Sequence, residues 1–152
     1  MAVELANSCK KIKFDVIDTW RGSPEHQIDG WDKQEMMIND TAFDAFQQNM
    51  LPAKGYYNPI KLSSMEASKL YQDGSLDFVF IDADKERYVQ YFDMVFPMVR
   101  LGGIIAADNI LEPARYADHI SKYTSYVRSN PKVISQLVPI DNGEEITIKI
   151  SA

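Results

Sequence analysis

The stretch LDFVFIDADK, residues 76–85, decides the fold. Five of its first six residues are apolar, which is typical of a strand buried on both faces, and the run ends at Asp82. A second such run, GGIIAADN at residues 102–109, begins with a glycine pair that predicts a turn and ends in Asp108 followed by an asparagine. Between the two, apolar residues recur every three or four positions over residues 85–99, which predicts a helix. Two buried strands joined by a helix indicate a parallel sheet.

The same alternation of strands and helices continues outward on both sides. The turn signal DNG at residues 141–143 separates two strand-like runs and predicts a hairpin. Residues 19–38 show no period and predict a long loop, in which Trp20 and Trp31 either stack on an adenine or aromatic substrate or pack over the edge of the core. The other strands are predicted at residues 12–17, 58–62, 133–140 and 145–150, and the other helices at 1–8, 41–50, 64–71 (with Ser64 as N-cap) and 113–128. We therefore expect an α/β fold, with a mostly parallel sheet and a C-terminal antiparallel hairpin, in a single domain over residues 1–152.

The composition excludes several classes of function. The 152 residues carry a net charge of -6 and the 16 basic residues are scattered, so neither a nucleic acid nor an anionic membrane is an expected partner. Cys9 is the single cysteine, which excludes an intrachain disulfide and a cysteine-based metal cluster. No apolar run approaches the ~18 residues of a membrane span, and Glu4 lies where an export signal would carry positive charge. The expected location is the cytoplasm.

Three predicted strands end in an acid, namely Asp18, Asp82 and Asp108. The carboxyl ends of parallel strands line the ligand crevice of an open sheet, and carboxylates gathered there repel one another unless a cation is bound. Asp82 and Asp108, together with the amide oxygen of Asn109, form an all-oxygen set that suits Mg²⁺ or Ca²⁺ and not zinc. For each acid taken alone, the alternative interpretation is a common helix cap.

Lys85 follows Asp82 by three residues in the predicted helix. A divalent cation that holds a substrate hydroxyl lowers the pKa of that hydroxyl and orients it, and Lys85 is then placed to accept the proton. The alternative interpretation of Lys85 is a solvated lysine at the start of a helix. A hydrolytic site is not predicted, because His26 and His119 lie far apart in the sequence and neither adjoins a candidate nucleophile.

The acidic residues and the glycine pair together match a family pattern. In order and at family spacing, DADK at residues 82–85, the glycine pair and DN at 108–109 resemble the metal-dependent O-methyltransferases typified by the caffeoyl-CoA and catechol enzymes. The stretch VIDTWRGSPEH, residues 16–26, is similar to a bacterial and phage branch of the same superfamily. The resemblance implies a Rossmann-like class I methyltransferase sheet and the transfer of a methyl group to a hydroxyl of a small molecule or sugar.

The resemblance also implies a role for each matching residue. The implied cofactors are S-adenosylmethionine and Mg²⁺, or another divalent cation such as Ca²⁺. Asp82, Asp108 and Asn109 are the implied metal ligands, and Lys85 is the implied general base. The implied cofactor-binding residues are Asp18 for the ribose hydroxyls, Thr19 and Trp20 beside it, Ser64 and Met65 at the adenine, and Asp84 at the amino group.

Two departures from the family pattern limit what the resemblance implies. Pro113 stands four residues after Asn109, where plant members carry a substrate-contacting asparagine, so a caffeoyl-CoA acceptor is not expected. Nothing before Lys10 matches the family's first strand and glycine-rich cofactor loop, so we expect a chain truncated at its N-terminus that binds cofactor poorly. Three outcomes are open for the strand edges left without that strand: they pair directly with each other, they pair with a strand of another chain, as in a homodimer, or they leave a looser fold. The alternatives are a non-catalytic fragment that no longer binds cofactor, and a dinucleotide-binding domain, for which the chain lacks the Gly-x-Gly-x-x-Gly motif.

Overall fold

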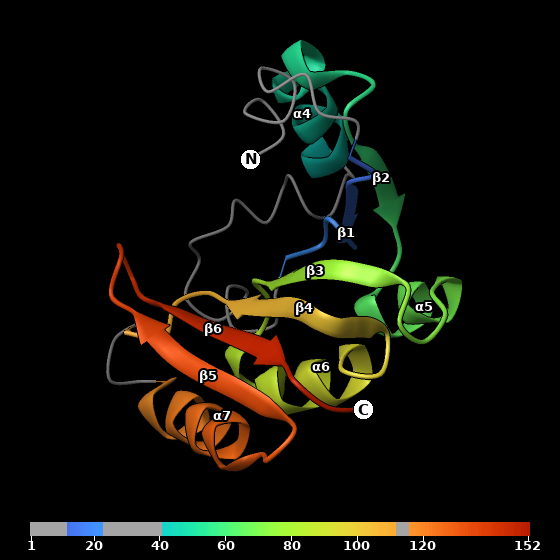
Figure 1. The fold of residues 1–152 in the computed structure, drawn as a ribbon. Coiled ribbons are helices and arrows are strands. Elements are labelled where there is room, and N and C mark those ends of the chain that lie inside the picture. Colours follow the sequence, from blue (N-terminus) through green and yellow to red (C-terminus); the bar gives the residue numbers. More distant parts are fainter. Residues whose placement is uncertain (1–11, 23–40, 112–115) are drawn as a thin grey trace. The chain divides into compact units, whose positions relative to one another are not determined.

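The computed structural model describes residues 12–22, 41–111 and 116–152 (Figure 1). The chain divides into two compact units, residues 1–67 and 68–152, and each unit is described by itself. The helix predicted at residues 1–8 and most of the predicted loop, including Trp31, lie outside the described residues, as does Pro113.

The first unit contains a two-stranded parallel sheet. Strand β1 (Asp15–Asp18) pairs with β2 (Asn58–Lys61) from Asp15 opposite Asn58 to Asp18 opposite Lys61. Between them come helix α4 (Thr41–Asn49) and a short 3-10 helix, η1 (Leu51–Ala53), so both strands and the helix predicted before Pro52 are confirmed within a few residues.

The second helix of this unit, α5 (Ser64–Ala67), is shorter than predicted. Its cap is Ser63 rather than Ser64: the Ser63 hydroxyl accepts a hydrogen bond from the Glu66 amide at 3.3 Å, and the Glu66 carboxylate accepts from the Ser63 amide at 3.1 Å. This reciprocal capping box fixes the start of the helix one residue earlier than the sequence analysis placed it. The chain then continues as a 3-10 helix, η2 (Ser68–Leu70), instead of a regular α-helix to Tyr71.

The second unit is a four-stranded mixed sheet in the order β3-β4-β6-β5. Strands β3 (Leu76–Ile81) and β4 (Val99–Ala107) are parallel, and β6 (Glu144–Lys149) lies antiparallel between β4 and β5 (Val133–Val138). The predicted parallel pair and C-terminal antiparallel hairpin are therefore confirmed.

Helices cover one face of this sheet (Figure 1). They are η3 (Lys85–Arg87), α6 (Tyr88–Val95) and α7 (Ala117–Ser129). Tyr88 and Phe92 of α6 and Tyr123 of α7 are almost fully buried, and both α6 rings meet Tyr123 edge to face, with the Tyr88 and Tyr123 centroids 5.5 Å apart. Burying each such ring contributes about 2 kcal/mol, so the predicted core positions Tyr88 and Phe92 fix α6 against both the sheet and α7.

The glycine pair does not form the predicted turn but lies inside β4. Gly102 has a φ of +74°, a conformation that favours glycine, and the strand register shifts between Leu76 and Phe78 beside it. A Cβ on Gly103 would lie 2.6 Å from Val99 Cγ1 and 3.0 Å from the carbonyl oxygen of Asp77. The pair is therefore a bulge that lets β3 and β4 approach closely.

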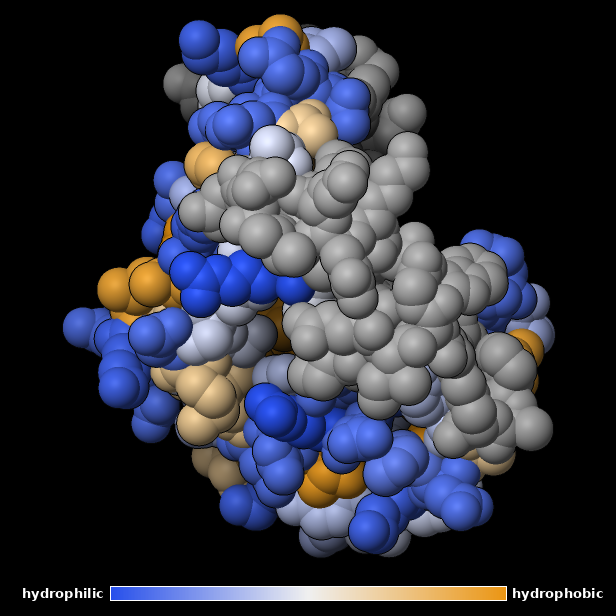
Figure 2. Space-filling view, turned by 180° about the vertical axis from the view of Figure 1, so that it is seen from behind, coloured by the Kyte–Doolittle hydropathy of each residue, from blue (hydrophilic) through white to orange (hydrophobic). Residues whose placement is uncertain are grey.

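The surface of the described residues is mixed in character. On the face in Figure 2, apolar residues form separate orange areas among hydrophilic residues. Among the helices in the described ranges, none is long and apolar enough to cross a membrane.

Candidate functional site

Two of the predicted acids lie side by side at one edge of the sheet. Ile81 at the end of β3 pairs with Ala107 at the end of β4, and the Asp108 amide donates to the Ile81 carbonyl at 3.0 Å. Asp82 and Asp108 are the next residues of the two strands, so the parallel register brings both carboxylates to this edge, as the sequence predicts.

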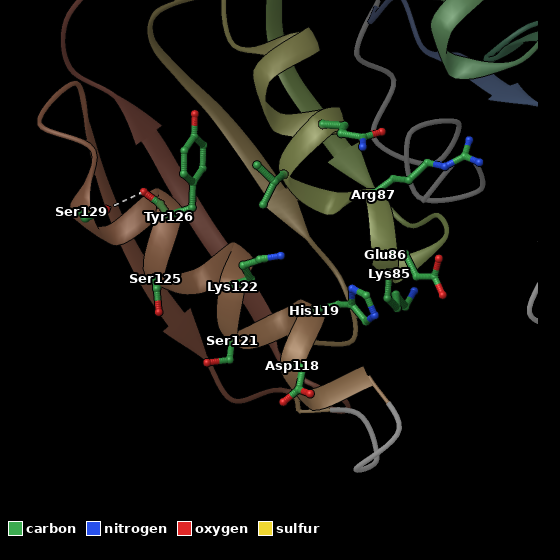
Figure 3. A pocket seen from close by; sticks show the side chains of 12 residues that line it. Lys85, Glu86, Arg87, Asp118, His119, Ser121, Lys122, Ser125, Tyr126 and Ser129 are labelled. Atoms are coloured by element: carbon green, nitrogen blue, oxygen red, sulfur yellow. Dashed lines mark hydrogen bonds between the residues drawn. The ribbon is translucent and has the colours of Figure 1, made fainter.

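Lys85 belongs to the same edge. Its Nζ lies 3.2 Å from Asp82 Oδ1 and 5.1 Å from the centre of the Tyr88 ring. The Lys85 side chain is 9% exposed and that of Asp82 is 55% exposed, so the interpretation of Lys85 as a solvated helix residue is wrong. Lys85 also lines a polar groove between η3–α6 and α7, to which His119 contributes from α7 (Figure 3).

The backbone after β4 holds Asp108 and Asn109 in a fixed turn. Asp108 Oδ1 accepts a hydrogen bond from the Asn109 amide at 2.6 Å, and the Asp108 carbonyl accepts one from the Tyr88 hydroxyl at 3.0 Å. Asn109 has a φ of +61°, which asparagine tolerates better than most residues. The next amide, that of Ile110, donates to the Gly143 carbonyl at 2.9 Å, which ties this turn to the β5–β6 hairpin.

Glu144 is a further acid at this edge that the sequence analysis missed. Because β6 is antiparallel, it begins at the edge where β3 and β4 end. Ala107 pairs with Glu145, so the same register places Glu144 opposite Asp108. The Oε2 atom of Glu144 is buried and has no hydrogen-bond partner. Burial, the charge of Asp108 and a side-chain interaction with that same carboxyl group, and the charges of Asp82 and Asp141 together raise the pKa of Glu144 to about 7.

The residues at this edge fit a hard divalent cation. Asp82, Asp108 and Asn109 offer oxygen ligands only, and the Oε2 atom of Glu144 is buried beside them without a hydrogen-bond donor. Within the described ranges, no three His, Cys, Asp or Glu side chains converge as a complete metal site. The predicted set has two carboxylates and an amide, so it depends on water or substrate for its other ligands, as magnesium sites usually do.

Asp84, the predicted partner of the cofactor amino group, is held by two neighbours. The Tyr91 hydroxyl donates to Asp84 Oδ1, and Arg87 Nε lies 3.2 Å from Asp84 Oδ2. Burial raises the pKa of Tyr91, and the hydrogen bond to Asp84 raises it further. Both carboxylate oxygens are therefore fixed in position, and a bound ammonium group would share them with Tyr91 and Arg87.

The remaining predicted cofactor residues lie in the first unit. Asp18 Oδ1 accepts a hydrogen bond from the Trp20 amide at 2.7 Å, and α5, which begins with Ser64 and Met65, packs against β1. Met65 is 61% exposed. The hydroxyl of Thr19 accepts from the Arg21 amide at 3.2 Å. These residues share one unit, and their contacts with a cofactor stay a prediction.

Trp20 packs within the first unit. It is 8% exposed, has a φ of +54°, and its ring centre lies 4.6 Å from that of Phe43 and 5.0 Å from that of Phe46. Of the two interpretations offered for this tryptophan, packing over the core edge describes its observed surroundings.

Comparison with known sequences identifies the family. The O-methyltransferase family model matches residues 58–149, which span β2 to β6. A probable caffeoyl-CoA O-methyltransferase of Dictyostelium discoideum is 33% identical over 114 residues, covering 64% of this chain and 49% of that protein. A flavonoid 3',5'-methyltransferase of Vitis vinifera is 34% identical over 87 residues, covering 47% of this chain and 37% of that protein. The chain thus spans about half the length of the curated relatives it matches.

Solved structures share the fold at low sequence identity. An O-methyltransferase of Bacillus cereus in complex with SAH has a TM-score of 0.58 at 19% identity, covering 72% of this chain and 58% of that one. The O-methyltransferase TomG of Streptomyces achromogenes, in complex with SAM, has a TM-score of 0.65 at 11% identity, covering 99% and 78%. Since the family model matches well over half of the residues and these folds agree, the chain belongs to the O-methyltransferase family.

Proposed function

We propose that this chain forms the acceptor side and part of the cofactor side of an S-adenosylmethionine-dependent O-methyltransferase that uses a divalent cation. The observation that carries the proposal is the buried Lys85, whose Nζ lies 3.2 Å from Asp82 at the edge where β3 and β4 end. The complexes of similar folds with SAM and SAH support the cofactor assignment.

The acceptor is proposed to be a hydroxyl of a small molecule or sugar. A cation bound by Asp82, Asp108 and Asn109 would hold the acceptor oxygen and make its proton more acidic. The Lys85 amine is placed to accept that proton, and a bound S-adenosylmethionine would supply the methyl group from its sulfonium. Tyr88 supports this arrangement, since its ring lies under Nζ and its hydroxyl holds the Asp108 carbonyl.

The residues proposed to bind the cofactor are Asp18, Ser64 and Met65 in the first unit and Asp84 in the second. Asp18 is suited to the two ribose hydroxyls, because a carboxylate accepts from both, and Ser64 and Met65 begin a helix that packs on the same strand. Asp84 offers negative charge to the cofactor ammonium group, and its link to Tyr91 keeps the carboxylate from rotating away. Proximity of methyl donor and acceptor then supplies much of the rate acceleration.

Calorimetric titration of S-adenosylhomocysteine into the purified chain, with and without Mg²⁺, tests the cofactor part. The expected result is saturable binding that weakens in Asp84→Asn, with Asp93→Asn, an exposed aspartate of α6, as the matched control. Absence of binding in the wild-type chain would favour the non-catalytic interpretation. Equal binding by both variants would remove Asp84 from the cofactor site and leave the rest in place.

A further inference from the structure

Glu144 is not among the metal ligands that the family pattern implies. Of the acids at this edge, it nevertheless has the fewest hydrogen-bond and ion-pair partners among the described residues to compensate its charge. Its Oε2 atom is buried without a hydrogen-bond partner. A buried carboxylate oxygen left without a donor destabilises the folded chain. Closing the hairpin does not require a carboxylate at this position, because a glutamine would supply an amide N–H as a donor to the acids around it.

The topology places Glu144 among the proposed cation ligands. The antiparallel register of β4 and β6 sets Glu144 opposite Asp108, and the parallel register of β3 and β4 sets Asp82 on the other side of Asp108. Two backbone hydrogen bonds fix the hairpin in position. The Ile110 amide donates to the Gly143 carbonyl at 2.9 Å, and the Leu111 amide donates to the Asn142 carbonyl at 2.7 Å. Three neighbouring strands therefore each bring one acid to the same edge.

Within the described residues, the ion pair shown for the acids at this edge is the one between Lys85 and Asp82. Lys85 lies at 3.2 Å from Asp82, whereas the hydrogen bond shown for the Asp108 carboxylate comes from the Asn109 amide. The next glutamate, Glu145, faces the opposite side of β6, where Arg128 pairs with it at 2.6 Å. Because Arg128 pairs with Glu145, its charge does not compensate Glu144. A cation bound from solution would provide that compensation.

We propose that Glu144 is a third carboxylate of the cation site, acting through a bound water on a cation held by Asp82, Asp108 and Asn109. The water-mediated contact agrees with the finding that the acids of the described residues do not converge as a complete ligand set. It also gives the buried oxygen a donor, because a metal-bound water donates strongly to an outer carboxylate. This inference rests on the cation proposed above and adds to it a residue that sets the affinity.

The test is a calorimetric titration of Mn²⁺ and of Mg²⁺ into the metal-stripped full chain. Removing an outer-shell partner typically weakens metal affinity by about 10- to 100-fold, and we expect a loss in this range for Glu144→Gln. The matched control is Glu86→Gln, the same change at an exposed residue of η3, which is expected to alter the affinity by less than about twofold because water and salt screen it. Asp108→Asn serves as the reference for losing a direct ligand.

A second measurement, thermal unfolding, separates an effect on folding from an effect on metal binding. Thermal unfolding of Glu144→Gln without metal is expected to occur at a temperature equal to or above that of the wild type, while the rise produced by Mn²⁺ is expected to be smaller. If Glu144→Gln binds Mn²⁺ as tightly as Glu86→Gln while Asp108→Asn binds weakly, the inference is overturned and the cation site of the proposed function stands. If the wild-type chain binds neither metal at millimolar concentration, the cation itself is refuted and this role of Glu144 with it.

Discussion

Two adjacent glutamates at the start of β6 have opposite surroundings. Glu145 is completely buried, and both of its oxygens are bonded: Oε1 accepts from Arg128 Nε and the Ser135 hydroxyl at 2.8 Å each, and Oε2 accepts from Arg128 Nη2 at 2.6 Å. Glu144, one residue earlier and on the other face of the strand, has a buried oxygen with no partner and faces other carboxylates. Burial of an acidic side chain is therefore not by itself a sign of function. The sign is burial without internal compensation.

The largest expected effect is the loss of the compensating charge on Glu145. Arg128→Met leaves the buried Glu145 carboxylate with the hydrogen bond from Ser135 but without its counter-charge. Because Arg128 itself is 45% exposed, the expected cost lies at the lower end of that for a broken buried pair, about 3 kcal/mol. The free energy of unfolding in urea measures this loss. The matched control is Arg100→Met, because Arg100 pairs with Asp77 at 2.6 Å on the surface, where the Asp77 side chain is 80% exposed. An exposed pair of this kind contributes at most about 1 kcal/mol. Similar losses in the two variants would show that Glu145 is not held as described.

A smaller effect is expected from Ser135, the neutral partner of Glu145. The Ser135 hydroxyl lies 2.8 Å from Glu145 Oε1 and 2.7 Å from Thr147 Oγ1. Ser135→Ala is expected to lower the free energy of unfolding by about 1–2 kcal/mol, because a hydrogen bond to a charged group is lost. Ser125→Ala, at an exposed position of α7, is the control and is expected to change stability by less than about 0.5 kcal/mol. Equal free energies of unfolding for the two variants would contradict the hydrogen-bond network around Glu145.

The smallest expected effect concerns pH and has the opposite sign. It is the smallest because Glu144 is only partly buried and solvent screens its charge. Burial and the neighbouring carboxylates raise the pKa of Glu144 to about 7 in the folded chain, above the ordinary glutamate pKa of 4.5 that applies when the chain is unfolded. Between these two values the folded chain binds the extra proton, so its stability falls as pH rises from about 4.5 to about 7. With a chelator present, the wild type is expected to lose stability across this range relative to Glu144→Gln. Parallel pH profiles of the two proteins would contradict the crowding of acids at this edge.

The sequence predicts those elements of the fold whose local residue pattern is enough to identify them. The buried runs 76–81 and 104–107, the helical spacing before Val95 and the turn at 141–143 all predict elements that the structure confirms. The glycine pair was misinterpreted because a bulge depends on the neighbouring strand: the carbonyl of Asp77 lies where a Cβ on Gly103 would be.

The same distinction applies to the site. Asp82, Lys85, Asp108 and Asn109 were predicted because they end parallel strands or follow such an end at a recognisable spacing. Glu144 was missed because it begins a strand. The signal that could have found it is the hairpin itself, since the second strand of a hairpin beside a parallel pair starts at the edge where that pair ends. The burial of Lys85 and the bonds of Asp84 depend on side chains from other elements, which no local pattern records.

The most direct test of the account is single-turnover methyl transfer from labelled S-adenosylmethionine to a simple catechol in the presence of Mg²⁺, comparing the wild-type chain with Lys85→Met. A general base typically contributes about 10²- to 10⁴-fold to a rate. We expect label on the catechol oxygen with the wild type and a rate at least about 100-fold lower with Lys85→Met, at unchanged affinity for S-adenosylhomocysteine. Equal rates for the two proteins would contradict the assignment of Lys85 and, with it, the proposed active site at the edge of β3 and β4.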